Sequence, residues 1–238
     1  ILILSFAVII IMTTLSTVGI ETDKFNKIIS EKINHSKKIK LDLKTINFKL
    51  DIKQLSLFLE AKKSKINYNN LSIPTQDIKV YLDFISLLKQ DLKIKKINLL
   101  LVELDFIQLK KLSEFIKPSN FKSFLNNNVT NGNLISEIEF FFDKEGLLNN
   151  YIIKGEVKNL NADFFNDIKL SKINLDFFAD KEDILVKNFY GNLGNIEIND
   201  GDIKLDLSNG TKISSNFNSK INLDEKALNK YSKIFNKI

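Results

Sequence analysis

Residues 76–105 alternate between apolar and polar side chains, and this alternation restricts the fold more than any other feature of the sequence. Ile78, Val80, Leu82 and Phe84 are separated by single residues of the other kind. A period of two is typical of a strand with one dry face. The alternation therefore predicts a β-strand here, followed by no more than one helical turn before the next strand.

The second strand of this stretch carries a shift of phase. Its apolar residues are Leu92, Ile94, Ile97, Leu99 and Leu101, with the shift at Lys95–Lys96. One extra residue turns every later side chain to the opposite face, so the shift predicts a β-bulge. The resulting unit of strand, turn and strand is apolar on one side and rich in lysine on the other, and most of the later sequence repeats it.

Composition narrows the classes of function. The chain has 238 residues, 44% of them hydrophobic, and no cysteine. These numbers allow one large or two small β domains and exclude both wholesale disorder and thiolate metal sites. The formal charge of +6 is carried by lysine alone, without arginine. Nucleic-acid readers depend on arginine for bidentate contacts, so we expect a solvated lysine face and no nucleic-acid partner.

The first twenty residues, 1–20, contain no charge. A bilayer core of about 30 Å needs about 20 apolar residues, so this segment predicts a transmembrane anchor. A cleaved signal peptide ending near Thr17-Val18-Gly19 is the alternative. Either interpretation places the following residues outside the cytoplasm.

Three short amphipathic helices are predicted. Residues 22–34 have apolar side chains at helical spacing, and His35 beyond them has no metal-ligating neighbours, so it is a surface residue. Residues 106–117 form the second helix, capped by Asp105 and stopped by Pro118. Residues 224–238 form the third. The absence of a tail after this helix favours a chain that is the front part of a longer one.

Alternation predicts further strands in both halves of the chain. In the first half, the strands are residues 39–43, 48–52, 55–59 and 66–68, with a turn at Asn69-Asn70 and a strand end at Pro74. In the second half, they are residues 138–142, 151–160, 168–177, 184–189, 196–207 and 213–223. The polar residues 119–128 between the halves predict a boundary, so we expect an anchor at 1–20 and β modules at 21–128 and 129–238.

Glycines mark the turns of the second half. Asn131-Gly132, Glu145-Gly146, Asp200-Gly201 and Asn209-Gly210 are each predicted to form a turn. The acidic clusters at Asp180–Asp183 and at Asp200 and Asp202 are interpreted as turn residues, because they do not match a calcium loop. We therefore expect no metal and no cofactor.

The sequence contains no catalytic constellation. It has no nucleophile elbow, no zinc-protease motif and no phosphate-binding loop, and its single histidine has no nucleophile beside it. We therefore expect no enzymatic activity and look for function in the shape of the sheet.

The apolar face of the sheet is the candidate site. About ten strands at a spacing of ~4.8 Å make a sheet about 48 Å wide, too wide for three short helices to cover. Either the sheet folds on itself into a closed core, or it forms an open groove for an apolar ligand. The candidate groove residues are Ile78, Val80, Leu82, Ile97, Leu99, Leu101, Ile173, Leu175, Phe177, Ile203, Leu205 and Leu207.

The order of features from Glu21 to Asp105 resembles the N-terminal region of the AsmA-like proteins, a family of bacterial envelope proteins of the YhdP and TamB type. The resemblance is based on the order of the apolar start, the helix around Phe25, the strands after that helix and the segment Tyr68-Asn69-Asn70-Leu71-Ser72-Ile73-Pro74. His35-Ser36 departs from it, since the family often has a Gly-Arg-like turn there. After Asp105 the resemblance rests on strand rhythm alone.

This resemblance implies a single-pass anchor in the bacterial inner membrane, a periplasmic body and a twisted, taco-like antiparallel β-groove. It further implies that phospholipids are the partners, carried between the inner and outer membranes in support of outer-membrane homeostasis, together with envelope proteins. The alternative is a passive anchored β scaffold with a closed core, involved in envelope assembly. The two differ in whether the apolar face is covered by protein.

Overall fold

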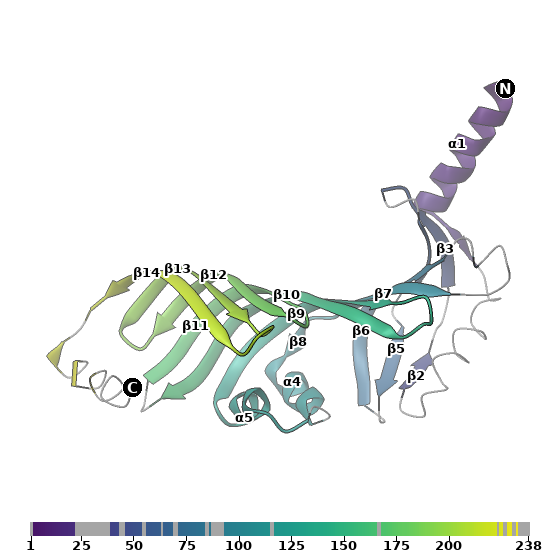
Figure 1. Cartoon of the computed structure of the whole chain (residues 1–238). Coiled ribbons are helices and arrows are strands. Elements are labelled where there is room, and N and C mark those ends of the chain that lie inside the picture. Colours follow the sequence, from purple (N-terminus) through teal and green to yellow (C-terminus); the bar gives the residue numbers. More distant parts are fainter. Residues whose placement is uncertain are drawn as a thin grey trace. The chain divides into compact units, whose positions relative to one another are not determined.

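The structure is a computed structural model that describes residues 2–21, 39–42, 46–53, 56–62, 64–68, 71–83, 86, 93–114, 117–165 and 168–222, and residues 224, 225, 228, 229 and 232. Over these residues the chain is mainly β with antiparallel strands, as the alternation predicts, and it has three short helices (Figure 1). The chain divides into two compact units. Unit 1 comprises Ile1–Val102 and Glu137–Tyr151, and unit 2 comprises Glu103–Ser136 and Ile152–Ile238.

Unit 1 is built on antiparallel strands that mostly follow each other in sequence. They are β1 (Ile20–Glu21), β2 (Ile39–Asp42), β3 (Ile46–Asp51), β4 (Ser56–Lys62), β5 (Lys65–Tyr68), β6 (Leu71–Leu82) and β7 (Ile94–Leu101). The strands are hydrogen-bonded in the order β1-β3-β4-β6-β7, and β5 joins β2 to the first half of β6. The second half of β9 completes this unit beside β7.

Unit 2 holds the longer strands. Its elements are β8 (Leu104–Asp105), α4 (Phe106–Ser113), α5 (Asn120–Asn127), β9 (Val129–Phe142), β10 (Leu148–Phe165), β11 (Ile168–Ala179), β12 (Asp183–Leu193), β13 (Ile196–Asp206) and β14 (Lys212–Ile221). Strands β9 and β10 each contribute to both units. From β10 to β14 each strand pairs with the next in an antiparallel meander. The sheet is not closed, because β14 pairs only with β13 among the described strands.

The core of unit 1 lies on one face of its sheet. Two rows of apolar residues cross β3, β4, β6 and β7 on that face: Ile46, Ala61, Ile78 and Leu99, and then Phe48, Leu59, Val80 and Ile97. The predicted bulge in β7 is confirmed, since Tyr81 pairs with Lys96 while Leu82 pairs with Ile94. The extra residue, Lys95, is what keeps Ile94 and Ile97 on the same face.

Helix α1 (Leu2–Thr17) is shorter than the predicted segment of residues 1–20. The chain leaves the helix at Gly19, whose φ is +80°, and Ile20 then pairs with Phe48 in a strand. Glycine adopts this left-handed conformation without steric cost, which makes it a common helix end. The predicted boundary is therefore corrected to Thr17.

Among the helices that the structure describes, none combines the length and the apolar character needed to cross a bilayer.

The predicted helix after Asp105 is confirmed as α4, but it ends at Ser113 and not before Pro118 as predicted. The Asp105 side chain accepts a hydrogen bond from the Gln108 amide at 2.8 Å, and the Gln108 side chain accepts one from the Asp105 amide at 3.0 Å. This capping box satisfies amides that have no partner within the helix. Helix α5, N-capped by Ser119, was not predicted, because its asparagines suggested a linker. The predicted helix at 22–34, His35, the turn at Asn69-Asn70 and most of the predicted helix at 224–238 lie outside the described residues.

Two of the four predicted glycine turns are confirmed. Glu145-Gly146 connects β9 to β10, and Asn209-Gly210 connects β13 to β14. The other two predictions are wrong, because Gly132 lies within β9 and Gly201 lies within β13. At Gly201 a Cβ atom would collide with the ring of Phe217 on β14, so this glycine serves cross-strand packing instead of a turn.

Pro74 does not end a strand as predicted, since it lies inside β6 opposite Lys65. Its carbonyl accepts a hydrogen bond from the Val102 amide at 3.1 Å. Proline lacks only the amide donor, so a strand can continue where just the carbonyl is needed.

Candidate functional site

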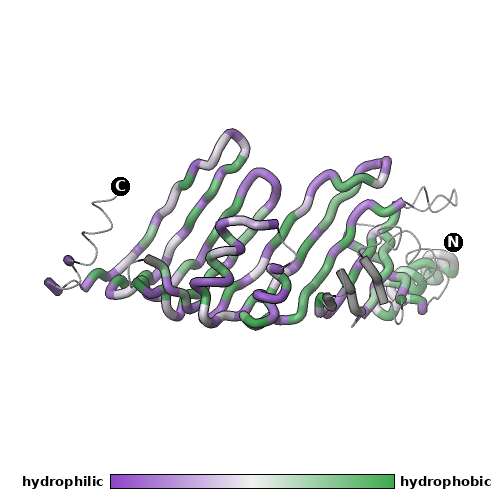
Figure 2. Tube along the Cα trace, turned by 90° about the horizontal axis from the view of Figure 1, so that it is seen from below, coloured by the Kyte–Doolittle hydropathy of each residue, from purple (hydrophilic) through white to green (hydrophobic). Residues whose placement is uncertain are grey.

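Strands β10 to β14 of unit 2 place their apolar residues on one face, which we call the unit 2 apolar face. Cross-strand pairing defines its rows. One row is Ile153, Ala179, Ile184, Leu205 and Ile213; the next is Gly155, Phe177, Val186 and Ile203; shorter rows pair Val157 with Leu175 and Leu160 with Ile173; the last is Ala162, Leu170, Leu193, Ile196 and Ile221. Hydrophobic and hydrophilic residues alternate along these strands (Figure 2).

This face remains open to solvent over much of its extent. Ile173 and Ile198 are buried, at 0% and 8% exposure, but most other members are half-buried. Toward β14 exposure rises, to 40% for Phe217 and 67% for Ile213. Helices α4 and α5 pack on each other, and α4 packs on β8. The elements that the structure describes therefore leave an apolar sheet surface without a complete cover.

Bulges keep the apolar residues of β10 to β13 in phase. Three of them contain the non-glycine residues with positive φ among those that the structure describes, namely Asn159, Lys172 and Asn188. Between Val157 and Leu160 the pairing with β11 shifts, so both residues stay on the same face despite their odd and even numbers. Bulges of this kind let a long twisted strand keep one dry face.

Asparagine side chains hold two of these bulges. The Asn159 amide donates to Oδ1 of Asn174 at 3.1 Å, and the Lys172 amide donates to Oδ1 of Asn161 at 3.0 Å. The third bulge is anchored by Asn188, whose Nδ2 donates to a carboxylate oxygen of Asp176 at 2.6 Å. Backbone groups that leave the ladder at a bulge thus find side-chain partners.

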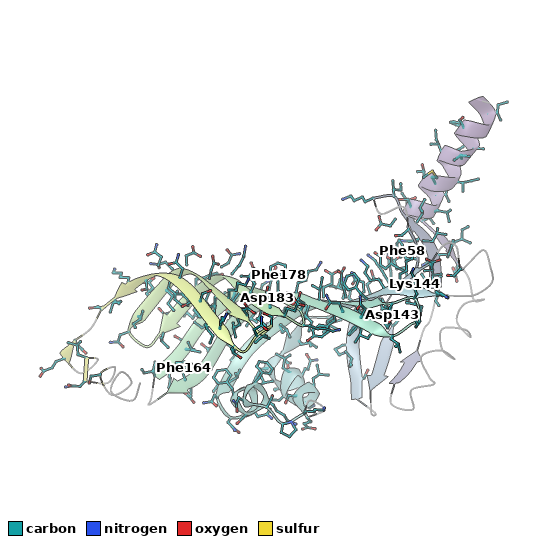
Figure 3. All side chains as sticks on the ribbon, in the orientation of Figure 1. Phe58, Asp143, Lys144, Phe164, Phe178 and Asp183 are labelled. Atoms are coloured by element: carbon teal, nitrogen blue, oxygen red, sulfur yellow. The ribbon has the colours of Figure 1, made fainter. Side chains whose placement is uncertain are left out.

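The opposite face of unit 2 is polar. Lys158 forms an ion pair with Glu156 at 2.9 Å, and Lys204 forms one with Asp183 at 3.5 Å. Exceptions include Phe178 and Leu185, which pair across β11 and β12 and line a shallow hollow with Ile152 and Asp183. Figure 3 labels Phe178 and Asp183. With water on this side and apolar groups on the other, the sheet is amphipathic across its width.

The predicted groove residues fall into two groups, one in each unit. Those of unit 2 lie on the open face: Ile173 is buried, Leu175, Phe177, Ile203 and Leu205 are half-buried, and Leu207 just after β13 is 38% exposed. Those of unit 1 lie in its core: Ile78, Val80, Leu82 and Leu101 are buried, and Ile97 and Leu99 pack against the buried cluster. The structure brings the members of each group together.

The polar face of unit 1 carries a dense set of charges. Glu60 is only 5% exposed and lies 2.8 Å from Nζ of Lys49. Lys96 lies 3.4 Å from Glu139 and 4.4 Å from the ring centroid of Tyr81. The ring of Tyr81 stacks on Phe58, with centroids 5.3 Å apart. These contacts allow charged side chains to be largely removed from water.

Burial shifts two pKa values on this face. The pKa of Asp77 is raised by burial and, secondarily, by the nearby carboxylate of Glu60. Burial also raises the pKa of Tyr81 to about 12, with a further contribution from Asp51 and Glu139. Both shifts have structural causes. Within the described part of the chain, no three histidine or acidic side chains come together as a metal site would require.

Sequence analysis did not predict the asparagine-supported bulges. The three non-glycine residues with a left-handed backbone conformation lie in no sequence pattern typical of a turn. The one visible signal is the change from odd to even apolar positions between Val157 and Leu160. Comparison of the chain with protein-family models, with curated proteins and with solved structures gave no match.

Proposed function

We propose that this protein binds phospholipid acyl chains on the unit 2 apolar face. Held at the bacterial inner membrane with its bulk in the periplasm, it conducts phospholipid between the inner and outer membranes and supports outer-membrane homeostasis. The observation that carries the proposal is the open apolar surface across β10 to β14. Soluble proteins rarely leave an apolar surface of this kind uncovered unless it binds something.

The chemistry of the face favours acyl chains over other apolar ligands. Its rows consist of aliphatic and phenylalanine side chains, with serine only on the edge strand β14. Five strands at a spacing of ~4.8 Å make a surface roughly 19 Å wide. Each methylene group that leaves water on such a surface contributes about 0.8 kcal/mol, while a headgroup stays hydrated.

Helix α1 supports the location at a membrane. Its apolar side chains point to all sides and are exposed, including Phe6 at 66% and Ile9 at 59%. The hydroxyl groups of Thr13 and Thr14 donate to the carbonyls of Ile9 and Ile10 at 2.7 and 2.8 Å. These hydroxyls therefore need no water, and the helix can embed in lipid at low cost. Envelope proteins that deliver or receive lipid are the expected protein partners, in agreement with the AsmA-like resemblance.

The second candidate function is a passive scaffold in envelope assembly, and the core of unit 1 favours it. There the candidate groove residues Ile78, Val80 and Leu82 are at most 4% exposed. A sheet whose apolar face is closed in this way binds no lipid. The two functions therefore differ in what occupies the face of unit 2.

A pair of lysine substitutions tests the proposal. In Phe177→Lys, the charged group can reach water along the open face, so we expect a modest loss of thermal stability and a loss of bound lipid. In the control Val80→Lys, the charge enters a closed core, and we expect destabilisation by several kcal/mol. Native mass spectrometry of the full chain measures co-purified phospholipid, and thermal melting measures stability. A parent protein without lipid, and a Phe177→Lys melt as low as that of Val80→Lys, would favour the scaffold.

A further inference from the structure

Among the residues that the structure describes, β14 is the last strand of the unit 2 sheet, and all ten of its residues are exposed. It pairs with β13 on one side, and no described residue pairs with its other side. Natural edge strands are protected by proline, bulges or central charges. Between its two lysines, Lys212 and Lys220, strand β14 has no proline or charge, and the bulge in its pairing with β13 lies on β13, at Asn199. Such an edge is a template for another strand.

The sequence of β14, KISSNFNSKI, is nearly palindromic about Phe217. If two copies pair antiparallel with Phe217 opposite Phe217, then Ile213 faces Ile221, Ser215 faces Ser219 and Asn216 faces Asn218. We propose that β14 pairs in this register with β14 of a second copy of the chain, around a two-fold axis at Phe217. An interface of this type is isologous, so it closes at the dimer.

Neighbouring registers are less favourable. A shift by two residues in one direction places Lys212 opposite Lys220, and like charges directly opposite each other destabilise an antiparallel pair. A shift by two residues in the other direction places Ile221 opposite Ser215 and Phe217 opposite Ser219. A shift by four residues again matches apolar with apolar residues, placing Ile213 opposite Phe217, but it pairs only part of the strand. The register centred on Phe217 matches apolar with apolar and polar with polar residues over the whole of Ile213–Ile221.

The backbone of β14 is oriented for this pairing. The Asn222 amide donates to the Asn195 carbonyl at 3.4 Å, toward β13. Because amides alternate along a strand, those of the even residues point toward β13 and those of Ser215, Phe217 and Ser219 point to the free edge. Two copies would form roughly ten hydrogen bonds, since a residue pair of this kind exchanges two.

The pairing also explains the exposed apolar side chains at this edge. Ile213, Phe217 and Ile221 are 67%, 40% and 57% exposed. They lie on the unit 2 apolar face, and a two-fold axis perpendicular to the sheet keeps that face on the same side in both copies. The dimer would join the two faces into one surface. The inference does not depend on lipid binding.

Two double variants at the same positions test both the dimer and its register. In Ser215→Lys/Ser219→Lys, the register places lysine opposite lysine twice, so we expect dimer affinity to fall roughly tenfold. In Ser215→Lys/Ser219→Glu, each lysine faces a glutamate of the other copy, so the dimer should persist. Both positions are exposed, and circular dichroism verifies that both variants fold. The readout is the mass of the full chain in mild detergent across a wide concentration range.

A mixing experiment removes the effect of net charge. Ser215→Glu/Ser219→Glu should by itself show a similar loss of dimer affinity, and mixing it with the double-lysine variant should restore that affinity. A monomeric parent protein at all concentrations would overturn the proposal and leave the edge to a strand of another protein. Equal dimer affinity of the double-lysine and lysine–glutamate variants would overturn the register and with it the proposal. Neither outcome bears on whether the chain carries phospholipid.

Discussion

The side chain of Asn174 accepts a hydrogen bond from the backbone amide of Asn159 at 3.1 Å, across the bulge between β10 and β11. Asn159 has a φ of 51°, a conformation that asparagine tolerates better than most residues. The contact stabilises the point at which β10 changes phase, and Leu160 thereby stays on the unit 2 apolar face.

Replacing Asn174 should loosen this bulge. Asn174 also donates from Nδ2 to the Lys172 carbonyl at 2.9 Å, so Asn174→Ala removes two hydrogen bonds. We expect a loss of about 1–3 kcal/mol in the free energy of unfolding, at 0.5–1.5 kcal/mol for each bond. Urea denaturation measures the loss, and hydrogen exchange at Leu160 localises it.

The matched control for this variant is Asn192→Ala. Asn192 lies on β12 with similar burial, and its side chain bonds to none of the residues that the structure describes. We expect a change within 0.5 kcal/mol, as is usual for such surface positions. An equal loss in both variants would contradict the role of Asn174.

Asp77 should oppose folding at neutral pH. Its pKa is raised by burial and by Glu60, so its ionised form is less favourable in the folded than in the unfolded chain. This cost is present above the raised pKa and disappears as the pH falls through it toward 3.8, the ordinary value. Asp77→Asn should therefore raise the melting temperature at pH 7 but not in acid, in melts followed by circular dichroism. A lower melting temperature at neutral pH would contradict this account.

Asp83 should behave in the opposite way. Hydrogen bonds from Lys95 and from the Ser86 amide lower its pKa to about 2. The stabilising contribution is present above the ordinary value of 3.8 and is lost as the pH falls through about 2. Carbon NMR of the carboxyl groups should show the titration of Asp83 below that of Asp77. The reverse order would show that the Lys95 contact does not persist in solution.

Tyr81 should resist ionisation in strong base. Its pKa is raised to about 12 by burial and then by Asp51 and Glu139, so the folded chain holds this proton more firmly than the unfolded chain does. Stability should consequently fall as the pH rises from 10.0 through about 12. The difference in ultraviolet absorbance between the parent protein and Tyr81→Phe reports this titration. A midpoint near 10.0 would indicate that Tyr81 is open to water.

Helix α1 should be required for membrane binding. Phe6→Lys/Ile10→Lys introduces two charges, and a charge within the apolar part of a membrane costs about 2.5–3.5 kcal/mol. We expect the parent chain to sediment with phospholipid vesicles and the double variant to stay largely in the supernatant. The control is Ile107→Lys on α4, because Ile107 is likewise an exposed apolar residue, at 63%. If the Ile107→Lys control loses vesicle binding to the same extent, α1 is not the element that contacts the membrane.

The sequence alone located most of the strands and the capped helix α4. The segments 168–177, 184–189 and 196–207 lie within β11, β12 and β13 or end one residue from them, and the bulge at Lys95 followed from a single shift of phase. These features depend on interactions between residues close in sequence, which a period of two or a capping box makes visible. The polar segment at α5 was misjudged, because asparagine favours loops and helix ends alike.

Tertiary structure decided the features that depend on distant residues. Gly201 gave the same Asp-Gly signal as a hairpin turn, yet the ring of Phe217 on the next strand needs the space above it. In the same way, Val80 and Phe177 both alternate with polar residues, but Val80 is buried while Phe177 is half-exposed. Alternation fixes which side of a strand is apolar, because neighbouring side chains point to opposite faces. Whether that side becomes a core or an open surface depends on which other elements pack against it, and no local pattern encodes those contacts.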